Sequence, residues 1–168
     1  MSDFTTWRSL VDGEEIGVIP DTSVSRDEDN GGSTEPAKTG IIVSSEEEWP
    51  EFDGRLSQNT SGVTEAFIEV KDESEPDDRG KEIGSVDISG LSAGDVFTVD
   101  LDENMVEEND YFLYVWAEGD DYEQGFNDSP DLPYESDDGN LSIVDGAEDD
   151  GPQSGAVYNV VEVGNLSQ

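Results

Sequence analysis

Residues 111–119 read YFLYVWAEG, and this segment is the strongest indicator of the fold. In a β-strand, successive side chains point to opposite faces of the sheet. One face of this stretch would carry Tyr111, Leu113, Val115 and Ala117, and the other Phe112, Tyr114 and Trp116. Because both faces are apolar, the stretch predicts a central strand that is covered on two sides.

Other strand signals surround this stretch at short spacing. They are IIVSS at 41–45, TEAFIEVK at 64–71, EIGSVDIS at 82–89, DVFTVDL at 95–101, NLSIV at 140–144 and AVYNVVEV at 156–163. Several alternate apolar with polar residues, which is typical of strands with one buried face. Six to eight such strands with Gly-rich turns predict an all-β fold, an antiparallel β-sandwich of the jelly-roll or immunoglobulin-like type.

The alternation also predicts which side chains form the core. We expect Ile68, Val70, Phe97, Val99, Leu113 and Val115 to lie inside the sandwich. The acidic segment EEEWPEFDG at 46–54 is expected to form a turn that Trp49 and Phe52 anchor. A long loop is expected at 119–140.

Three segments are expected along the chain. Residues 1–21 form an N-terminal arm for attachment and oligomerisation, 22–53 an acidic linker with a short strand, and 54–168 the β-sandwich. The arm is rich in large apolar side chains for a terminal segment: Phe4, Trp7, Leu10, Val11, Ile16, Val18 and Ile19. A fraying terminus is the alternative, but these side chains favour an arm that docks on a partner.

The charge is extreme, with 44 Asp and Glu against 7 Lys and Arg, a formal net charge of −37. At ordinary ionic strength this charge opposes compaction, so disorder is the first alternative. The aliphatic and aromatic strand segments argue against disorder because they can bury apolar surface. At 1 M salt the Debye length falls to about 3 Å, and surface carboxylates then hardly repel one another. We therefore expect a folded protein of an extreme halophile.

Missing residue types exclude several functions. The chain has no cysteine and no histidine, which removes disulfides, thiolate metal sites and Ser-His-Asp catalysis. An acidic chain without a basic stripe is not expected to bind nucleic acid. No apolar run approaches the length of a membrane span, and the N-terminus lacks the pattern of a signal peptide, so neither is expected. No cofactor is expected.

The segment at 125–146, GFNDSPDLPYESDDGNLSIVDG, is a candidate binding site. Asp137, Asp138 and Asp145 are candidates for a cation site, but solvated acids are favoured because 44 of 168 residues are acidic. Tyr122, Phe126 and Tyr134 are candidates for contact with a surface ligand such as a glycan, and packing of the loop is the favoured alternative. A glycosidase would need two carboxylates at a set distance, which the sequence cannot select.

Two stretches, 54–101 and 111–147, together resemble a β-sandwich module of virion structural proteins from haloarchaeal tailed viruses. The resemblance lies in the turn GLSAGD at 90–95, a strand that ends in AEG at 117–119, and the turn YESDD at 134–138. The N-terminal TTWRSLVDGEEIGVIPD at 5–21 is similar to the start of such proteins. An acidic insertion at 72–80 departs from the pattern, and the chain is short for a long fibre.

The resemblance implies a non-enzymatic virion protein, assembled in the host cytoplasm and carried on the extracellular particle. It would be an oligomeric capsid decoration, turret or tail component. Its expected partners are further copies of itself and other capsid or tail proteins, with contact to a host surface glycoprotein or glycan as a further expectation. The alternative is a carbohydrate-binding module of a haloarchaeal cell-surface or secreted protein. An enzyme is the least favoured hypothesis.

Overall fold

The fold was analysed in a computed structural model. It describes residues 4–5, 19–20, 23–26, 31–33, 38–46, 48–71, 80–105, 109–118, 121–148, 151–153, 155–164 and 166. All regular secondary structure in these residues is β-strand, which confirms the predicted all-β class. The described residues contain no helix with the length and apolarity that a membrane crossing needs.

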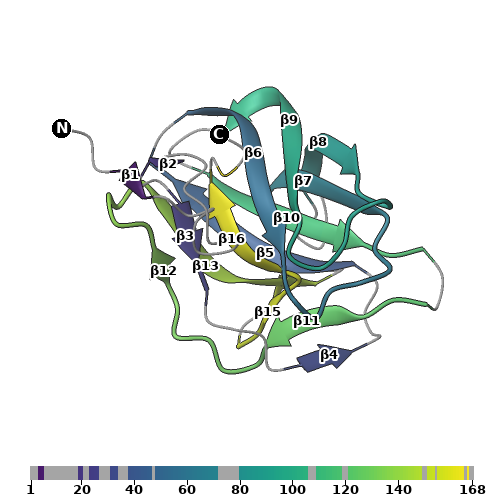
Figure 1. Ribbon diagram of the computed structural model, residues 1–168. Helices are drawn as coiled ribbons and strands as arrows, with labels where there is room; N and C mark the ends of the chain where they lie inside the picture. Colours follow the sequence, from purple (N-terminus) through teal and green to yellow (C-terminus); the bar gives the residue numbers. More distant parts are fainter. Residues whose placement is uncertain are drawn as a thin grey trace.

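The larger sheet has seven strands (Figure 1). Its order is β12 (Tyr134–Glu135), β13 (Leu141–Glu148), β5 (Lys38–Ser45), β10 (Asp110–Trp116), β7 (Glu65–Lys71) and β8 (Gly80–Asp87), and β14 (Gly151–Gln153) pairs with β13. All the pairings in this sheet are antiparallel. The strand β10 lies between β5 and β7, as a central strand should.

The second main sheet has four strands in the order β3 (Ser23–Ser25), β16 (Val160–Gly164), β6 (Trp49–Leu56) and β9 (Val96–Met105). In Figure 1, β6 and β16 pass over β5 and β10 of the larger sheet. Two small sheets complete the architecture. One holds β15 (Val157–Tyr158), β11 (Gln124–Asn127) and β4 (Gly31–Ser33), and the other pairs β1 (Phe4–Thr5) with β2 (Ile19–Pro20).

The main core lies between the seven-stranded and four-stranded sheets. Ile41, Ile68 and Leu113 from the larger sheet pack in one cluster with Phe52 and Val99 from the smaller sheet, and all are fully buried. This is the arrangement of a β-sandwich, in which two inner faces interdigitate. Of the six core residues predicted from the sequence, five are buried, and Val70 packs against the cluster while partly exposed.

The strand β10 is apolar on both faces, as predicted. Tyr111, Leu113 and Val115 belong to the main core. Phe112 and Tyr114 point to the opposite face and form a second buried cluster with Ile42, Phe67 and Ala147. This second cluster lies on the outer face of the larger sheet, away from the four-stranded sheet.

Several expectations about element boundaries were wrong. The strand expected at 41–45 runs over Lys38–Ser45 and lies in the middle of the larger sheet, and residues 49–54 of the expected acidic turn belong to the strand β6. The core therefore begins upstream of residue 54, where the sandwich was expected to start. The acidic composition of this segment made β6 look like a turn. Its predicted anchors Trp49 and Phe52 are buried and pack edge to face, with ring centroids 6.3 Å apart.

The expected loop at 119–140 contains two short strands, β11 and β12. The segment at 156–163, expected as one strand, is two. Between β15 and β16, Asn159 adopts a left-handed conformation with φ of 59°, which breaks the strand. Asparagine tolerates this conformation better than most residues because its side chain can form local hydrogen bonds.

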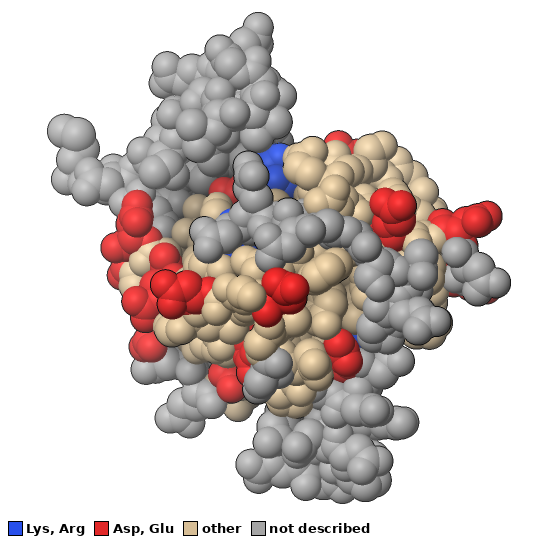
Figure 2. Space-filling model, turned by 90° about the horizontal axis from the view of Figure 1, so that it is seen from below, with Lys and Arg blue, Asp and Glu red and all other residues tan. Residues whose placement is uncertain are grey.

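Two arginine side chains are used inside the fold. Arg26 and Arg55 are buried, and Arg26 Nε donates to the carbonyl of Val160 at 2.5 Å. Arg55 Nε lies 3.1 Å from a carboxylate oxygen of Glu162. The face in Figure 2 carries Asp and Glu at many separate places with little Lys or Arg among them. The acidic charge on this face is therefore mostly uncompensated, in keeping with the net charge of −37.

Candidate functional site

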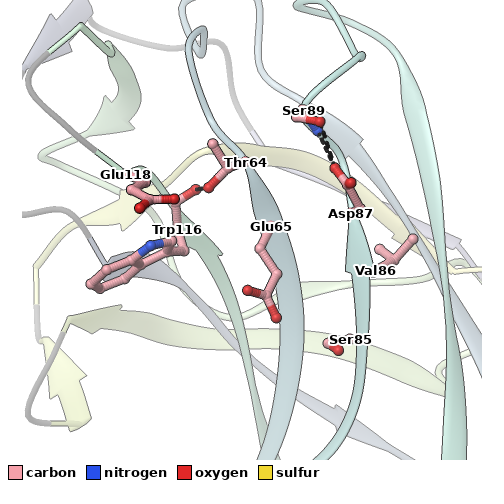
Figure 3. Close-up of a pocket in the computed structure, with 8 residues that line it drawn as sticks. All are labelled: Thr64, Glu65, Ser85, Val86, Asp87, Ser89, Trp116 and Glu118. Carbon is pink, nitrogen blue, oxygen red and sulfur yellow. Dashed lines mark hydrogen bonds between the residues drawn. The ribbon is translucent and has the colours of Figure 1, made fainter.

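An open groove of about 540 Å³ lies at one end of the outer face of the larger sheet (Figure 3). Glu65 begins β7 and Thr64 directly precedes it. Ser85, Val86 and Asp87 end β8 and Ser89 follows it, while Trp116 ends β10 and Glu118 follows it. We call this feature the Trp116 groove. Its walls combine one indole, three carboxylates and three hydroxyl groups.

Strand register explains why these residues meet. Trp116 on β10 lies directly opposite Glu65 on β7, and Glu65 lies directly opposite Asp87 on β8. Directly paired residues of antiparallel strands project to the same face, with Cβ atoms about 4.5–5.5 Å apart. The indole and two carboxylates therefore form one row across three neighbouring strands.

Trp116 is 37% exposed and is the only exposed large hydrophobic side chain among the described residues. Its backbone is held in place, because its carbonyl accepts a hydrogen bond from the backbone N–H of Thr64 at 2.8 Å and lies 3.4 Å from the Thr64 hydroxyl. These contacts fix the backbone of Trp116 next to the start of β7, where the indole lines the groove. Its exposure is a consequence of its place at the end of β10.

The indole is the exposed end of an aromatic stripe along the outer face. Phe112 and Tyr114 stack with ring centroids 5.9 Å apart and planes at 6°, and Phe67 packs on Tyr114 at 5.5 Å. Both partners of Tyr114 are buried. Since Phe112, Tyr114 and Trp116 alternate along one strand, they share a face, and only the last reaches solvent.

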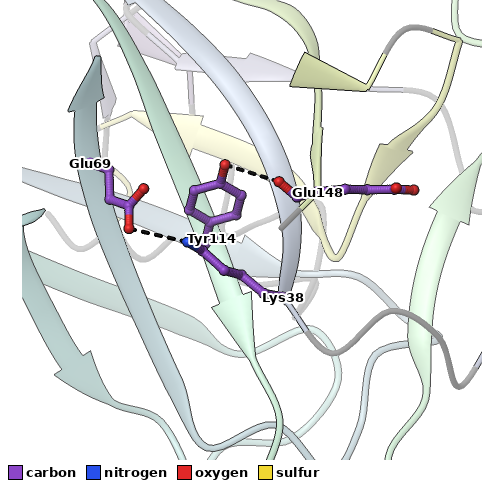
Figure 4. Close-up of polar contacts among 4 residues, drawn as sticks. All are labelled: Lys38, Glu69, Tyr114 and Glu148. Carbon is purple, nitrogen blue, oxygen red and sulfur yellow. Dashed lines mark hydrogen bonds and ion pairs between the residues drawn. The ribbon is translucent and has the colours of Figure 1, made fainter. Parts of the chain in front are cut away.

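A lysine covers the buried part of this stripe (Figure 4). Lys38 Nζ lies 4.3 Å from the centroid of the Tyr114 ring and 3.2 Å from Oε1 of Glu69. The Tyr114 hydroxyl donates to the carbonyl of Glu148 at 3.1 Å. Lys38 is thus engaged in a cation–π contact and an ion pair, and these interactions seal the aromatic cluster next to the groove.

The carboxylate of Asp87 is held by a neighbouring serine. It accepts hydrogen bonds from the backbone N–H of Ser89 at 2.9 Å and from its hydroxyl at 2.6 Å. These bonds lower the pKa of Asp87 below the usual aspartate range, the hydroxyl bond being the larger cause. A general acid for glycoside cleavage needs the opposite shift, so Asp87 is suited to accepting hydrogen bonds rather than donating a proton.

The aromatic residues considered from sequence occupy different surroundings. Tyr122 is buried. Phe126 is half-buried and packs on Tyr158 with ring centroids 6.4 Å apart. Tyr134 is half-buried against the main core. None of the three lines the Trp116 groove, and their contacts agree with the favoured alternative, packing of the 119–140 segment.

The three acidic candidates lie in different surroundings: Asp138 in a turn, Asp145 within β13, and Asp137 on the surface. Asp138 Oδ1 accepts from the Ser136 hydroxyl at 2.8 Å and from the backbone N–H of Asn140 at 3.1 Å. Asp145 Oδ1 accepts from the N–H of Gly146 at 2.9 Å, and Asp137 is exposed. The described part of the chain has no group of three or more acidic side chains placed to hold a metal ion.

Most of the predicted N-terminal docking residues cannot be placed. Trp7, Leu10, Val11, Ile16 and Val18 lie outside the described residues. Phe4 and Ile19 belong to β1 and β2, which pair antiparallel with Phe4 opposite Pro20. The two ends of the arm are therefore brought together by backbone pairing.

Sequence reasoning missed Glu65, Asp87 and Glu118 as groove residues. The sequence places Trp116 on an apolar face, just before the loop that carries the candidate stacking residues Tyr122, Phe126 and Tyr134. Its place at the end of a two-sided apolar strand, next to Glu118, was the available signal. Comparisons of the chain with models of known protein families, with curated proteins and with solved structures give no match. Proposals about its function therefore rest on its own residues and geometry.

Proposed function

We propose that the chain is a non-enzymatic structural protein of a haloarchaeal virion, which carries its β-sandwich on the outside of the capsid or tail. The acid-coated sandwich supports this proposal, because a particle released into brine needs surface proteins that stay folded and dispersed at multimolar salt. The apolar N-terminal arm is the proposed attachment and oligomerisation segment.

The observation that carries the proposal is that the polar side chains of the two turn motifs, which carry the resemblance to virion proteins, form hydrogen bonds within their own turns. In the turn at 90–95, the N–H of Ser92 donates to Oδ2 of Asp95 at 2.8 Å, and the N–H of Asp95 donates back to the carbonyl of Ser92 at 3.0 Å. In the turn at 134–138, the Ser136 hydroxyl donates to Asp138 and accepts from the N–H of Leu141. These polar groups close turns, which favours a scaffold role over catalysis.

The experiment is to locate the protein on purified particles. Virions are banded by density in high salt, and the chain is sought by mass spectrometry and by electron microscopy of particles labelled with an antibody against the sandwich. The proposal expects the chain in the particle band at a fixed ratio to the major capsid protein. Recovery only from the host envelope or the medium, free of particles, would overturn it.

A second candidate function is a carbohydrate-binding module of a haloarchaeal cell-surface or secreted protein. The exposed indole of Trp116 in an open polar groove favours it, since sugar-binding surfaces use exposed aromatic rings as platforms. The same fractionation separates the two candidates, because the module would travel with the cell envelope or the medium and the virion protein with particles.

A further inference from the structure

We propose that the Trp116 groove binds a neutral pyranose ring, with the indole against the apolar face of the sugar and groove carboxylates as acceptors for its hydroxyl groups. This inference deepens the contact with host glycans in the proposed function and rests on it for its biological meaning. The binding itself is a property of the isolated chain.

The indole supplies the stacking surface. A tryptophan has a broad apolar face and a polar N–H at its edge, so it suits ligands that are apolar on one side and wet on the other. Single exposed hydrophobic residues are common on protein surfaces. Trp116 differs because it lies in a groove of about 540 Å³, within the range of small-molecule sites, with polar groups converging around it.

The carboxylates supply the specificity for hydroxyl groups. Glu65 and Asp87 lie in one cross-strand row with Trp116, and Glu118 follows it by two residues. Each ionised carboxylate can accept hydrogen bonds from sugar hydroxyls, and such charge-assisted bonds are stronger than neutral ones. Ser89 already orients the Asp87 side chain, so this side chain loses little conformational entropy when a ligand binds.

The charge of the groove selects the class of sugar. Its three carboxylates only accept hydrogen bonds, so the acceptor-only carboxylate of a uronate or sulfate of a sulfated sugar finds no donor among them, and none of the lining residues is basic. Lys38, which is paired in register with Trp116, is engaged with Glu69 and the Tyr114 ring. In multimolar salt the attraction for cationic ligands is screened, while stacking and hydrogen bonding persist. A neutral sugar therefore fits best.

The test is a titration of the full chain in high salt with methyl glycosides of neutral hexoses, with glucuronate and with choline. The three tryptophans give separate indole N–H signals in ¹H–¹⁵N spectra, and the signal lost in Trp116→Ala identifies Trp116. We expect at least one neutral glycoside to shift the Trp116 signal, and glucuronate and choline to leave it unchanged.

Two variants test the site and one controls for charge. Trp116→Ala should weaken binding tenfold or more, because it removes the stacking surface. A tenfold loss corresponds to about 1.4 kcal/mol of binding free energy. Glu118→Gln should also weaken it. Glu135→Gln removes an exposed carboxylate from β12, at the other end of the sheet order, and should bind as the parent does. Unchanged dispersion of the remaining signals shows that each variant is folded.

The outcomes separate this inference from the proposed function. Binding of choline or glucuronate without any neutral glycoside, or neutral-sugar binding that survives Trp116→Ala, would overturn the inference. The absence of any response across the panel would also overturn it. None of these three results bears on where the protein lies on particles. Conversely, neutral-sugar binding by a chain found only in the envelope fraction would support the groove and overturn the virion role.

Discussion

Asn159 Nδ2 donates a hydrogen bond to Oγ1 of Thr39 at 2.7 Å, across 120 residues of sequence. Both residues are buried. The Thr39 hydroxyl in turn donates to Oε1 of Gln124 at 2.5 Å, and Thr60 Oγ1 lies 3.1 Å from Oδ1 of Asn159. This network joins β5, β11 and the loop after β6 at the point where β15 passes into β16. A buried polar network whose members satisfy one another specifies one arrangement of the chain.

The first prediction concerns this network. Asn159→Gly keeps the left-handed backbone but leaves the hydroxyls of Thr39 and Thr60 without their amide partner, so it should cost about 1–3 kcal/mol of unfolding free energy. Asn159→Ala should cost more, because alanine is also strained at a φ of 59° by roughly 1–2 kcal/mol. Urea unfolding at constant high salt measures both. Equal stabilities of the two variants would contradict the strain argument.

The second prediction concerns β10. Leu113 is fully buried in the main core, and Leu113→Ala should destabilise the fold by about 2–5 kcal/mol. Trp116→Ala, three residues along the same strand, is the matched control and should cost much less because the indole is exposed. The measurement is the urea midpoint of each variant. Similar losses for both would mean that the outer end of β10 packs as tightly as the core.

The third prediction concerns salt. With a net charge of −37, the chain should fold only at high ionic strength, where the Debye length is short. Circular dichroism in dilute buffer should show a largely unfolded chain, and a β spectrum should appear as KCl is added. A full β spectrum without added salt would refute the halophilic interpretation.

The fourth prediction concerns Glu82 on β8. Partial desolvation, and then the neighbouring charges of Glu65 and Glu69, raise the pKa of Glu82 above the usual glutamate range. A raised carboxyl pKa means that the folded state binds the proton more tightly than the unfolded state. The charged form therefore opposes folding above the folded-state pKa, and this penalty disappears as pH falls through that pKa towards the ordinary glutamate value.

Glu82→Gln should accordingly lower the salt concentration needed for folding at neutral pH, and the difference from the parent should vanish in acid. The matched control is Glu103→Gln, whose carboxylate lies 2.5 Å from Lys81 Nζ. Removing that attraction should leave the salt midpoint unchanged or raise it. A higher salt requirement for Glu82→Gln would show that repulsion at this position is not limiting.

The fifth prediction concerns the N-terminal arm. Deleting residues 1–20 should leave a folded, salt-dependent monomer, because the residues described in the cluster between the two main sheets all lie at Val24 or beyond. The truncated chain should no longer oligomerise or join particles. Analytical ultracentrifugation in high salt and co-sedimentation with particles measure the two properties. If the truncated chain still assembles and still binds particles, attachment lies on the sandwich instead.

The class of the fold and much of its core could be predicted from the order of the residues. Side chains alternate along a strand with a period of two, so TEAFIEVK and YFLYVWAEG reveal which residues share a face before any partner strand is known. The two-sided apolar pattern of residues 111–117 was enough to place that strand in the middle of a sheet. The acidic excess was likewise enough to predict a charged surface.

The pairing of the strands could not be predicted in this way and is known from the three-dimensional fold alone. Antiparallel pairing depends on residues far apart in sequence, and a period of two gives the face of each strand but neither its partner nor its register. The row of Trp116, Glu65 and Asp87 exists because β7 lies between β10 and β8 in one particular register. Among 44 acidic residues no local pattern could select those two carboxylates. The buried contact of Asn159 with Thr39 is hidden for the same reason, since only folding brings two ordinary polar residues from distant strands together.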